Sequence, residues 1–323
     1  MARTPDEVRD GVELSSLDSG LFDGAEATKR DLIDYLDAVA ERMIPWLTGR
    51  PLSVVRVRPG QEPFMQKNVP KYTPKWIPTV QLWAQTSKRE VNYALCEDRR
   101  TLLWLGNQRA VEYHPTLVRA DDWQHPDYLV LDLDPPEGSD FATVARAARL
   151  VQQALDDLGL RGAVKTSGSK GLHIFVPLDG ASADDAAAAT RAIAARAEQV
   201  DPDVGTTEYV KDKREGKVFL DSTRSYGATV VAAYSPRVRP GATVSFPLAW
   251  DELEDVTPRE FTVKSAIGLL GDGDPWAERM PEPQRLCDDL IAEGMEIPVA
   301  RVVAMHEGKR RKREQEQQSE GGS

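Results

Sequence analysis

Two aspartates close an apolar run at residues 128–136, which read Tyr-Leu-Val-Leu-Asp-Leu-Asp-Pro-Pro. The run predicts a buried strand that ends at a proline turn. Because alternate residues of a strand point to the same side, Asp132 and Asp134 project together and Leu133 faces the opposite way. Like charges at the rim of an apolar sheet are costly without a cation, and hard oxygen ligands suit Mg²⁺ and Mn²⁺. A strand end with two solvated aspartates would explain the same letters.

A second pattern follows at residues 164–176, Val-Lys-Thr-Ser-Gly-Ser-Lys-Gly-Leu-His-Ile-Phe-Val. It predicts a strand, a loop of small residues and another strand. Small residues let backbone N–H groups approach an oxyanion, and Ser167, Lys170 and His173 add side-chain donors. The spacing is not that of a P-loop. Taken alone, such a loop is more often a hairpin turn, and a buried core histidine is the alternative for His173.

A third pattern, residues 217–224, is an apolar strand that delivers Asp221, with Arg224 three residues later. One strand thus ends in paired acids, one leads into a Ser/Lys/His loop, and one ends in an acid followed by an arginine. Together they supply what metal-dependent phosphoryl or nucleotidyl transfer needs. The acids would hold metal ions, and the cations and the small loop would hold phosphates.

At this point the chain resembles the polymerase domain of bacterial ligase D, a branch of the archaeo-eukaryotic primase superfamily. The strings that carry the resemblance are DLDP, TSGSKGLHIFVPL and KVFLDSTR, at residues 132–135, 166–178 and 217–224. Further matches lie at residues 28–35, 48–52, 233–241, 247–253 and 274–276. Their order and spacing cover the chain from about residue 14 to about residue 280.

The resemblance implies that Asp132, Asp134 and Asp221 are the catalytic acids and that they bind two Mn²⁺ or Mg²⁺ ions. It also implies a nucleotide-binding set, Ser167, Lys170, His173, Arg224 and His114. For His114 a purely structural role is an equal alternative.

The stretch from residue 50 to residue 90 is basic, although the whole chain has a formal net charge of -11. Aromatic residues are interleaved with its lysines and arginines, a mixture that suits nucleic acid because bases stack on rings while cations hold phosphates. A solvated basic face is the plainer alternative. The resemblance implies that Phe64 stacks on the template base and that Lys67 lies beside DNA, with Met65 in place of a second phenylalanine.

The resemblance also implies a pocket near the N-terminus for the 5′-phosphate of a break or gap. Its family members use an asparagine and two lysines there, at the positions of Ser16, Ser19 and Lys29 in this chain. A hydroxyl brings no charge, so one cation is missing. Lys211 and Arg214 are further candidates for contact with nucleic-acid phosphate.

The function implied is a primase-polymerase that extends primer ends on DNA with NTP or dNTP, biased toward ribonucleotides and Mn²⁺, in gap filling or end joining. Ku and a separate DNA ligase are implied partners. Three alternatives compete: a haloacid-dehalogenase-type phosphatase, a metal-dependent nuclease and a non-catalytic DNA-end binder. The phosphatase expects Thr or Val where Pro136 stands, and a nuclease has no need of a triphosphate loop.

Composition sets wider limits. With 323 residues and 41% hydrophobic residues, the chain can bury a large core. Two cysteines without metal-site spacing, and no apolar stretch of signal or membrane type, predict a cytoplasmic, nucleoid-associated protein. A monomer is expected.

The predicted fold is α/β to α+β, a primase-polymerase core with a mixed, mostly antiparallel sheet flanked by helices. Helices are expected at residues 27–47, 140–158, 183–199 and 282–292. Strands are expected at residues 52–57, 91–95, 217–220 and 229–233, residues 101–105 form a strand or the start of a helix, and residues 60–78 form a loop. We expect a catalytic domain at residues 1–281 and a helix with a disordered basic tail at 282–323.

Overall fold

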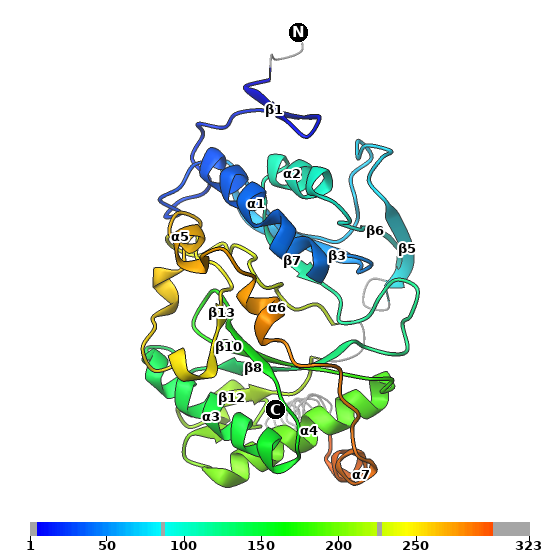
Figure 1. Cartoon of the computed structure of the whole chain (residues 1–323), viewed down its shortest axis with the longest axis vertical. Coiled ribbons are helices and arrows are strands. Elements are labelled where there is room, and N and C mark those ends of the chain that lie inside the picture. Colours follow the sequence, from blue (N-terminus) through cyan, green and yellow to red (C-terminus); the bar gives the residue numbers. More distant parts are fainter. Residues whose placement is uncertain (1–4, 85–87, 225–227, 300–323) are drawn as a thin grey trace, which may run out of the picture.

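The computed structural model describes residues 5–84, 88–224 and 228–299, and two large sheets dominate it (Figure 1). The first sheet has the strand order β11-β12-β8-β10-β9-β13. In chain order its strands are β8 (Tyr128–Asp134), β9 (Ala163–Thr166), β10 (Leu172–Pro177), β11 (Gly205–Thr206), β12 (Val218–Asp221) and β13 (Pro247–Leu248). Its pairs are antiparallel except for β11 with β12.

The second sheet has the order β4-β3-β6-β5, and β7 also pairs with β3. Its strands are β3 (Leu52–Arg58), β4 (Gln61–Gln66), β5 (Thr79–Ala84), β6 (Arg89–Ala94) and β7 (Ala110–Pro115). A hairpin of β1 (Glu7–Arg9) and β2 (Val12–Leu14) stands apart from both sheets. The expected mixed, mostly antiparallel architecture flanked by helices is confirmed.

Helices cover the sheets in two groups (Figure 1). Helices α1 (Lys29–Met43) and α2 (Arg99–Asn107) pack together beside the second sheet, and α3 (Phe141–Asp157) and α4 (Ala183–Val200) pack against the first. Shorter helices follow at α5 (Ala266–Leu270), α6 (Pro275–Arg279) and α7 (Asp288–Glu296), with 3₁₀ turns η1 (Ile44–Trp46), η2 (Lys211–Lys213), η3 (Trp250–Glu252) and η4 (Pro258–Glu260). No helix in the described ranges is long and apolar enough to cross a bilayer.

Local chemistry explains where the principal helices begin. Thr28 caps α1 in a capping box with Asp31, and Asp140 and Ser182 accept hydrogen bonds from the first turns of α3 and α4. The helix expected from residue 27 therefore starts two residues later, and Pro45 lies in η1 directly after it.

Three local expectations are wrong. Residues 60–78 contain the strand β4, because the chain turns at Gly60 and pairs back onto β3 despite its prolines. Residues 229–233 form no strand and make one isolated bridge, Thr116 with Thr229. The last expected helix starts at Asp288, well after residue 282.

Helix α7 packs tightly onto α4. A Cβ on Gly294 would lie 1.9 Å from the Ala188 carbonyl oxygen, so only glycine permits this approach. Arg196 forms an ion pair of 2.5 Å with Glu293 across the same contact. The proposed boundary between residues 281 and 282 stays a prediction, and the basic run at 309–313 lies outside the described residues.

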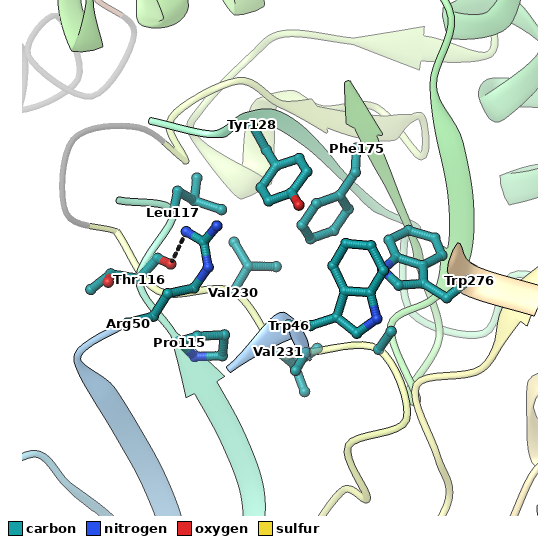
Figure 2. Close-up of a pocket in the computed structure, with 12 residues that line it drawn as sticks. Trp46, Arg50, Pro115, Thr116, Leu117, Tyr128, Phe175, Val230, Val231 and Trp276 are labelled. Carbon is teal, nitrogen blue, oxygen red and sulfur yellow. Dashed lines mark hydrogen bonds between the residues drawn. The ribbon is translucent and has the colours of Figure 1, made fainter. Parts of the chain in front are cut away.

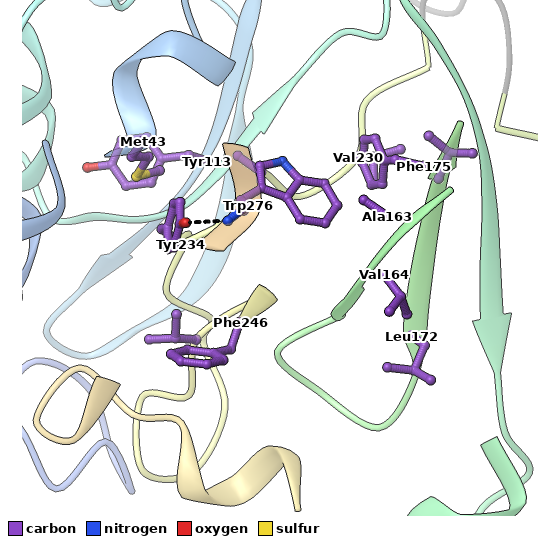
Figure 3. Packing of buried hydrophobic residues seen from close by; sticks show 14 of the residues in the cluster. Met43, Tyr113, Ala163, Val164, Leu172, Phe175, Val230, Tyr234, Phe246 and Trp276 are labelled. Atoms are coloured by element: carbon purple, nitrogen blue, oxygen red, sulfur yellow. Dashed lines mark hydrogen bonds between the residues drawn. The ribbon is translucent and has the colours of Figure 1, made fainter. Parts of the chain in front are cut away.

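Aromatic rings from the first sheet, η1 and α6 pack together. Figure 2 shows Trp46, Tyr128, Phe175 and Trp276 around a cavity of about 30 Å³. That volume holds about one water molecule and no nucleotide, so this is packing and not a ligand site. Figure 3 shows the adjoining core, where the backbone N–H of Trp276 donates to the Tyr234 hydroxyl at 3.0 Å.

Candidate active site

The predicted acids meet on two neighbouring central strands. Strand β12 runs antiparallel to β8, and their register pairs Asp221 with Asp132. Asp132 and Asp221 are 7% and 6% exposed, and Asp134, the last residue of β8, is exposed. Because alternate residues of β8 share a face, all three carboxylates belong to one side of the sheet.

Arg224 bridges two of these acids. Its Nη2 donates to Asp132 Oδ2 at 2.9 Å, and its Nε lies 3.4 Å from Asp221 Oδ2. Burial raises the pKa of Asp132, but His173 and then Arg224 outweigh it and hold this pKa below its ordinary value. The sequence placed Arg224 beside the triphosphate, whereas its guanidinium here neutralises the acids.

Asp134 carries charge that Arg224 does not neutralise. Loss of solvent around the carboxyl, followed by repulsion from Asp132 and Asp221, raises the pKa of Asp134 to about 6. Oxygen donors under mutual repulsion fit a hard divalent cation such as Mg²⁺ or Mn²⁺. No group of three or more His, Cys, Asp and Glu side chains in the described residues converges to hold a metal ion.

The small loop between β9 and β10 is held by hydrogen bonds within the loop itself. Ser167 Oγ accepts hydrogen bonds from the Ser169 and Gly171 N–H groups, at 3.2 and 3.1 Å. A Cβ on Gly171 would lie 2.1 Å from the Leu133 carbonyl oxygen, so glycine is required where the loop passes β8. The loop is therefore anchored against the strand that carries the acids.

A cavity of about 870 Å³ is lined by Asp134 and by residues of this loop. Asp134, Ser167 and Lys170 line it together with Arg239 and Arg259. Lys170 is exposed, and Arg239 Nε donates to Ser169 Oγ at 3.1 Å. One side of the cavity is thus acidic, and the other offers cations and hydroxyl groups.

His173 lies between the loop and the acids. It is 4% exposed, and its Nε2 lies 3.3 Å from Asp132 Oδ1. Burial, followed by the charge of Lys165, lowers the pKa of His173 to about 4. It is as buried as a core histidine, yet its ring contacts Asp132 on one side and Lys165 on the other.

The family described as LigD, primase-polymerase domain, matches residues 28–276. The chain belongs to this family. It is 33% identical to the Bifunctional non-homologous end joining protein LigD of Bacillus subtilis, over 84% of this chain and 45% of that protein. It is also 33% identical to the Multifunctional non-homologous end joining DNA repair protein LigD of Mycobacterium tuberculosis, over 90% of this chain and 41% of that protein. The chain thus spans less than half the length of these relatives.

Among solved structures, the chain is similar to the polymerase domain from Mycobacterium tuberculosis ligase D in complex with DNA. The TM-score is 0.76 and the identity is 32%, covering 83% of this chain and 97% of that one. The expected fold and family are confirmed. The roles of individual residues in this LigD-type domain stay predictions.

His114 belongs to a network behind the small loop. Its Nε2 lies 2.8 Å from Glu112 Oε2, and Glu112 also pairs with Arg237 at 3.1 Å. Burial raises the pKa of Glu112, but the hydrogen bond to His114 and the charge of Arg237 bring it down to about 2. Because Arg237 donates to the Ser167 carbonyl oxygen, His114 is linked to the loop through this network.

The predicted template-side residues lie on or just after β4, an edge strand of the second sheet. Phe64 is half-buried, with the Arg58 guanidinium 4.9 Å from its ring centre. Met65 is 46% exposed, and Lys67 is exposed. An exposed edge that combines a ring with cations can stack a base and hold phosphate.

Among the residues expected to form an N-terminal phosphate pocket, Lys29 is buried and already bonded within the protein. Lys29 is 3% exposed and donates to the Ser15 carbonyl oxygen and to Asn107 Oδ1, both at 2.6 Å. Burial, followed by repulsion from Arg109, lowers the pKa of Lys29 to about 8. Ser16 adopts a left-handed backbone conformation with φ 57°, and its carbonyl oxygen accepts from the Ser19 hydroxyl.

Lys211 and Arg214 differ in availability. Lys211 is exposed in η2. Arg214 donates to the carbonyl oxygens of Glu208 and Tyr209, each at 3.0 Å, and lies 3.7 Å from the centre of the Phe219 ring. Arg214 therefore braces its own loop, and Lys211 faces solvent.

Sequence reasoning gave no role to several cations near these sites. Arg237 and Arg239 lie in a string that matches the family, but no role was given to them. Arg109 gave no sequence signal, and the structure places its Nη1 3.4 Å from Ser19 Oγ, 90 residues away in the chain. Such a contact depends on how the N-terminal segment folds over α2.

Proposed function

We propose that this LigD-type domain adds nucleotides to a primer end under the direction of a template, at the acidic centre of Asp132, Asp134 and Asp221. The observation that supports this most is the shared cavity, which Asp134 lines together with Ser167 and Lys170. Polymerisation needs a group for the metal-bound phosphates and a group for the free phosphate oxygens within one site.

The three carboxylates would hold divalent ions. Mn²⁺ or Mg²⁺ bound there would neutralise charge that develops on the reacting phosphate. The carboxyl of Asp134, whose pKa is raised by partial burial and by its acidic neighbours, is the group that gains most from such a cation. We expect two ions, with Mn²⁺ preferred as the family resemblance implies.

Arg224 would exchange partners when metal binds. Its guanidinium pairs with Asp132 and Asp221 in the structure. Divalent ions at the same oxygens would repel it, and the triphosphate offers the nearest new anion. The earlier expectation that Arg224 contacts the nucleotide and its present ion pairs then describe two states of one side chain.

The substrate proposed is gapped or broken DNA with NTP or dNTP. Both LigD relatives carry non-homologous end joining in their names, and the structural neighbour is bound to DNA. Ku and a separate ligase are proposed as partners on that basis, in the cytoplasm. Phe64 and Lys67 would contact the template strand, and Lys211 an outer phosphate.

Arg109 supplies a cation where position 19 lacks one. Its Nη2 donates to the Gly20 carbonyl oxygen at 2.6 Å while Nη1 lies beside Ser19 Oγ. We therefore propose that a downstream 5′-phosphate is held by Arg109 together with Lys29 and Ser16. In this proposal the Arg109 guanidinium replaces the positive charge that the family resemblance expects at position 19.

A phosphatase or a nuclease is less well supported. A nuclease does not need the Ser167 loop and its adjoining cations, and family membership favours polymerisation. The deciding experiment is primer extension on gapped DNA, with NTP against dNTP and Mn²⁺ against Mg²⁺. We expect extension that favours NTP and Mn²⁺. Hydrolysis of DNA or nucleotide without extension would contradict the proposal.

A further inference from the structure

A row of four polar residues crosses the first sheet. The register pairs Lys165 of β9 with His173 of β10, His173 with Asp132 of β8, and Asp132 with Asp221 of β12. Directly paired residues point to the same face of a sheet. The row therefore connects Lys165, which has no role in the proposed mechanism, with Asp132 and Asp221, which do have one.

Lys165 is the most buried member of this row. It has no exposed surface, and a buried ammonium is costly unless its hydrogens are used. Its Nζ donates to Ser245 Oγ at 2.6 Å and lies 2.8 Å from His173 Nδ1. Among the described residues it forms no direct ion pair with a carboxylate, so a buried salt bridge does not explain why a lysine occupies this position.

The directions of these hydrogen bonds are fixed from both ends. The Ser245 hydroxyl gives its hydrogen to the Thr166 carbonyl oxygen at 2.7 Å, so its oxygen accepts from Lys165. At the other end, His173 Nε2 lies 3.3 Å from Asp132 Oδ1, and because a carboxylate can only accept, we assign the hydrogen of this contact to Nε2. Nδ1 of a neutral ring then carries a lone pair, and Lys165 donates to it.

We propose that Lys165 is a positioning residue that holds His173 in the Nε2–H tautomer and fixes its ring against Asp132. A histidine that binds a metal through Nε2 usually donates Nδ1–H to a carbonyl or carboxylate. Here a donor occupies that place. His173 therefore presents an N–H to the site, which suits an anionic oxygen of phosphate or carboxylate and does not suit a metal ion.

The tautomer can be measured without any assay of activity. Long-range ¹H–¹⁵N spectra of the labelled full chain report the protonation of each ring nitrogen, and His173→Gln identifies the signals of His173. We expect the Nε2–H pattern in the wild type and a mixture of tautomers in Lys165→Met. An Nδ1–H pattern in the wild type, or an unchanged pattern in Lys165→Met, would overturn the proposal.

Ser245→Ala provides a matched control. It removes the other hydrogen bond of the same ammonium and leaves the contact between Lys165 and His173 in place. We expect it to retain the Nε2–H pattern. If Ser245→Ala and Lys165→Met mix the tautomers equally, the effect comes from general loosening of the core and the positioning role is wrong. Thermal melting of each variant verifies that it folds.

A kinetic cycle extends the test, and this part rests on the proposed function. Lys165→Met should raise the apparent KM for nucleotide about tenfold, with DNA affinity unchanged. In a His173→Gln background the same change should cost less than about twofold, because the partner is already absent. Additive losses would refute the role. If the wild type adds no nucleotide, the proposed function fails, and the spectra still decide the role of Lys165.

Discussion

The acidic centre and the basic surface around β4 are built in opposite ways. Asp132 and Asp221 lie on central strands, are nearly buried and already have partners in the protein. Phe64 and Lys67 lie on or just after an edge strand and face solvent in part or fully. The comparison teaches that the buried acids are already held by protein contacts, while the side chains on and just after β4 keep exposed surface for a ligand.

The largest expected effect is loss of nucleotide addition when an acid is removed. Asp134→Ala or Asp221→Ala should lower the rate about a thousandfold or more, because the charge that would hold the metal is lost. DNA affinity should change less than about twofold, since the basic surface is untouched. Single-nucleotide addition in saturating Mn²⁺ measures the rate, and fluorescence anisotropy measures DNA binding.

Asp156→Ala is the control for these variants. Asp156 is an exposed aspartate of α3, outside the cavity that Asp134 lines. It should retain full activity. Near-normal addition by Asp134→Ala and Asp221→Ala would remove the distinction between the two regions.

Two lysine variants should have opposite effects, one on nucleotide binding and the other on DNA binding. Lys170→Ala should raise the KM for nucleotide about tenfold with little change in DNA affinity, because Lys170 lines the cavity of the acids. Lys67→Ala should weaken DNA binding and leave the nucleotide KM nearly unchanged. If Lys170→Ala mainly weakens DNA binding, the proposed division between a nucleotide-binding region and a DNA-binding region is wrong.

The sequence predicts the acidic centre well because each part of it is local. Asp132 and Asp134 follow from strand alternation within one segment, and the Ser167 loop from small residues between two strands. The strand β4 was missed because its pairing with β3 overrides the loop signal of glycine and prolines. Residues 101–105 could be resolved as helix only once Asp98 was seen to cap α2.

The connections between segments could not be predicted. Arg224 on Asp132, Arg109 at Ser19 and Lys165 at Ser245 join residues that are 92, 90 and 80 apart in the chain. Such contacts depend on how whole elements pack, and no local pattern encodes them. Lys165 did offer one signal, a charge inside a short strand of buried residues.

A smaller effect is expected from the template side. Phe64→Ala should weaken binding to a templating strand by about 1 kcal/mol, the lower end for loss of one stacked base. The cations of Arg58 and Lys67 remain in this variant, so only the stacking contribution is lost. Met65→Phe should strengthen binding by adding a second ring. Titrations with single-stranded and gapped DNA measure both, and tighter binding by Phe64→Ala would exclude the stacking role.

The smallest effect concerns the 5′-phosphate. Arg109→Ala should reduce the preference for a 5′-phosphorylated gap and lower the salt slope of binding by about one counterion. Lys29→Ala should erase the preference, and Ser19→Lys should strengthen it. Because Lys29 is buried, its variant needs a melting curve beside the binding curve. A full preference in both Arg109→Ala and Lys29→Ala would place the phosphate elsewhere.

The most direct test of the central claim is a templating-base exchange. Wild type and Asp134→Ala are given gapped DNA with Mn²⁺, each nucleotide alone, and each of the possible bases opposite the gap. The account predicts that the wild type adds the nucleotide complementary to the templating base and that Asp134→Ala adds none. Addition that ignores the templating base, or that persists in Asp134→Ala, would contradict template-directed transfer at this acidic centre.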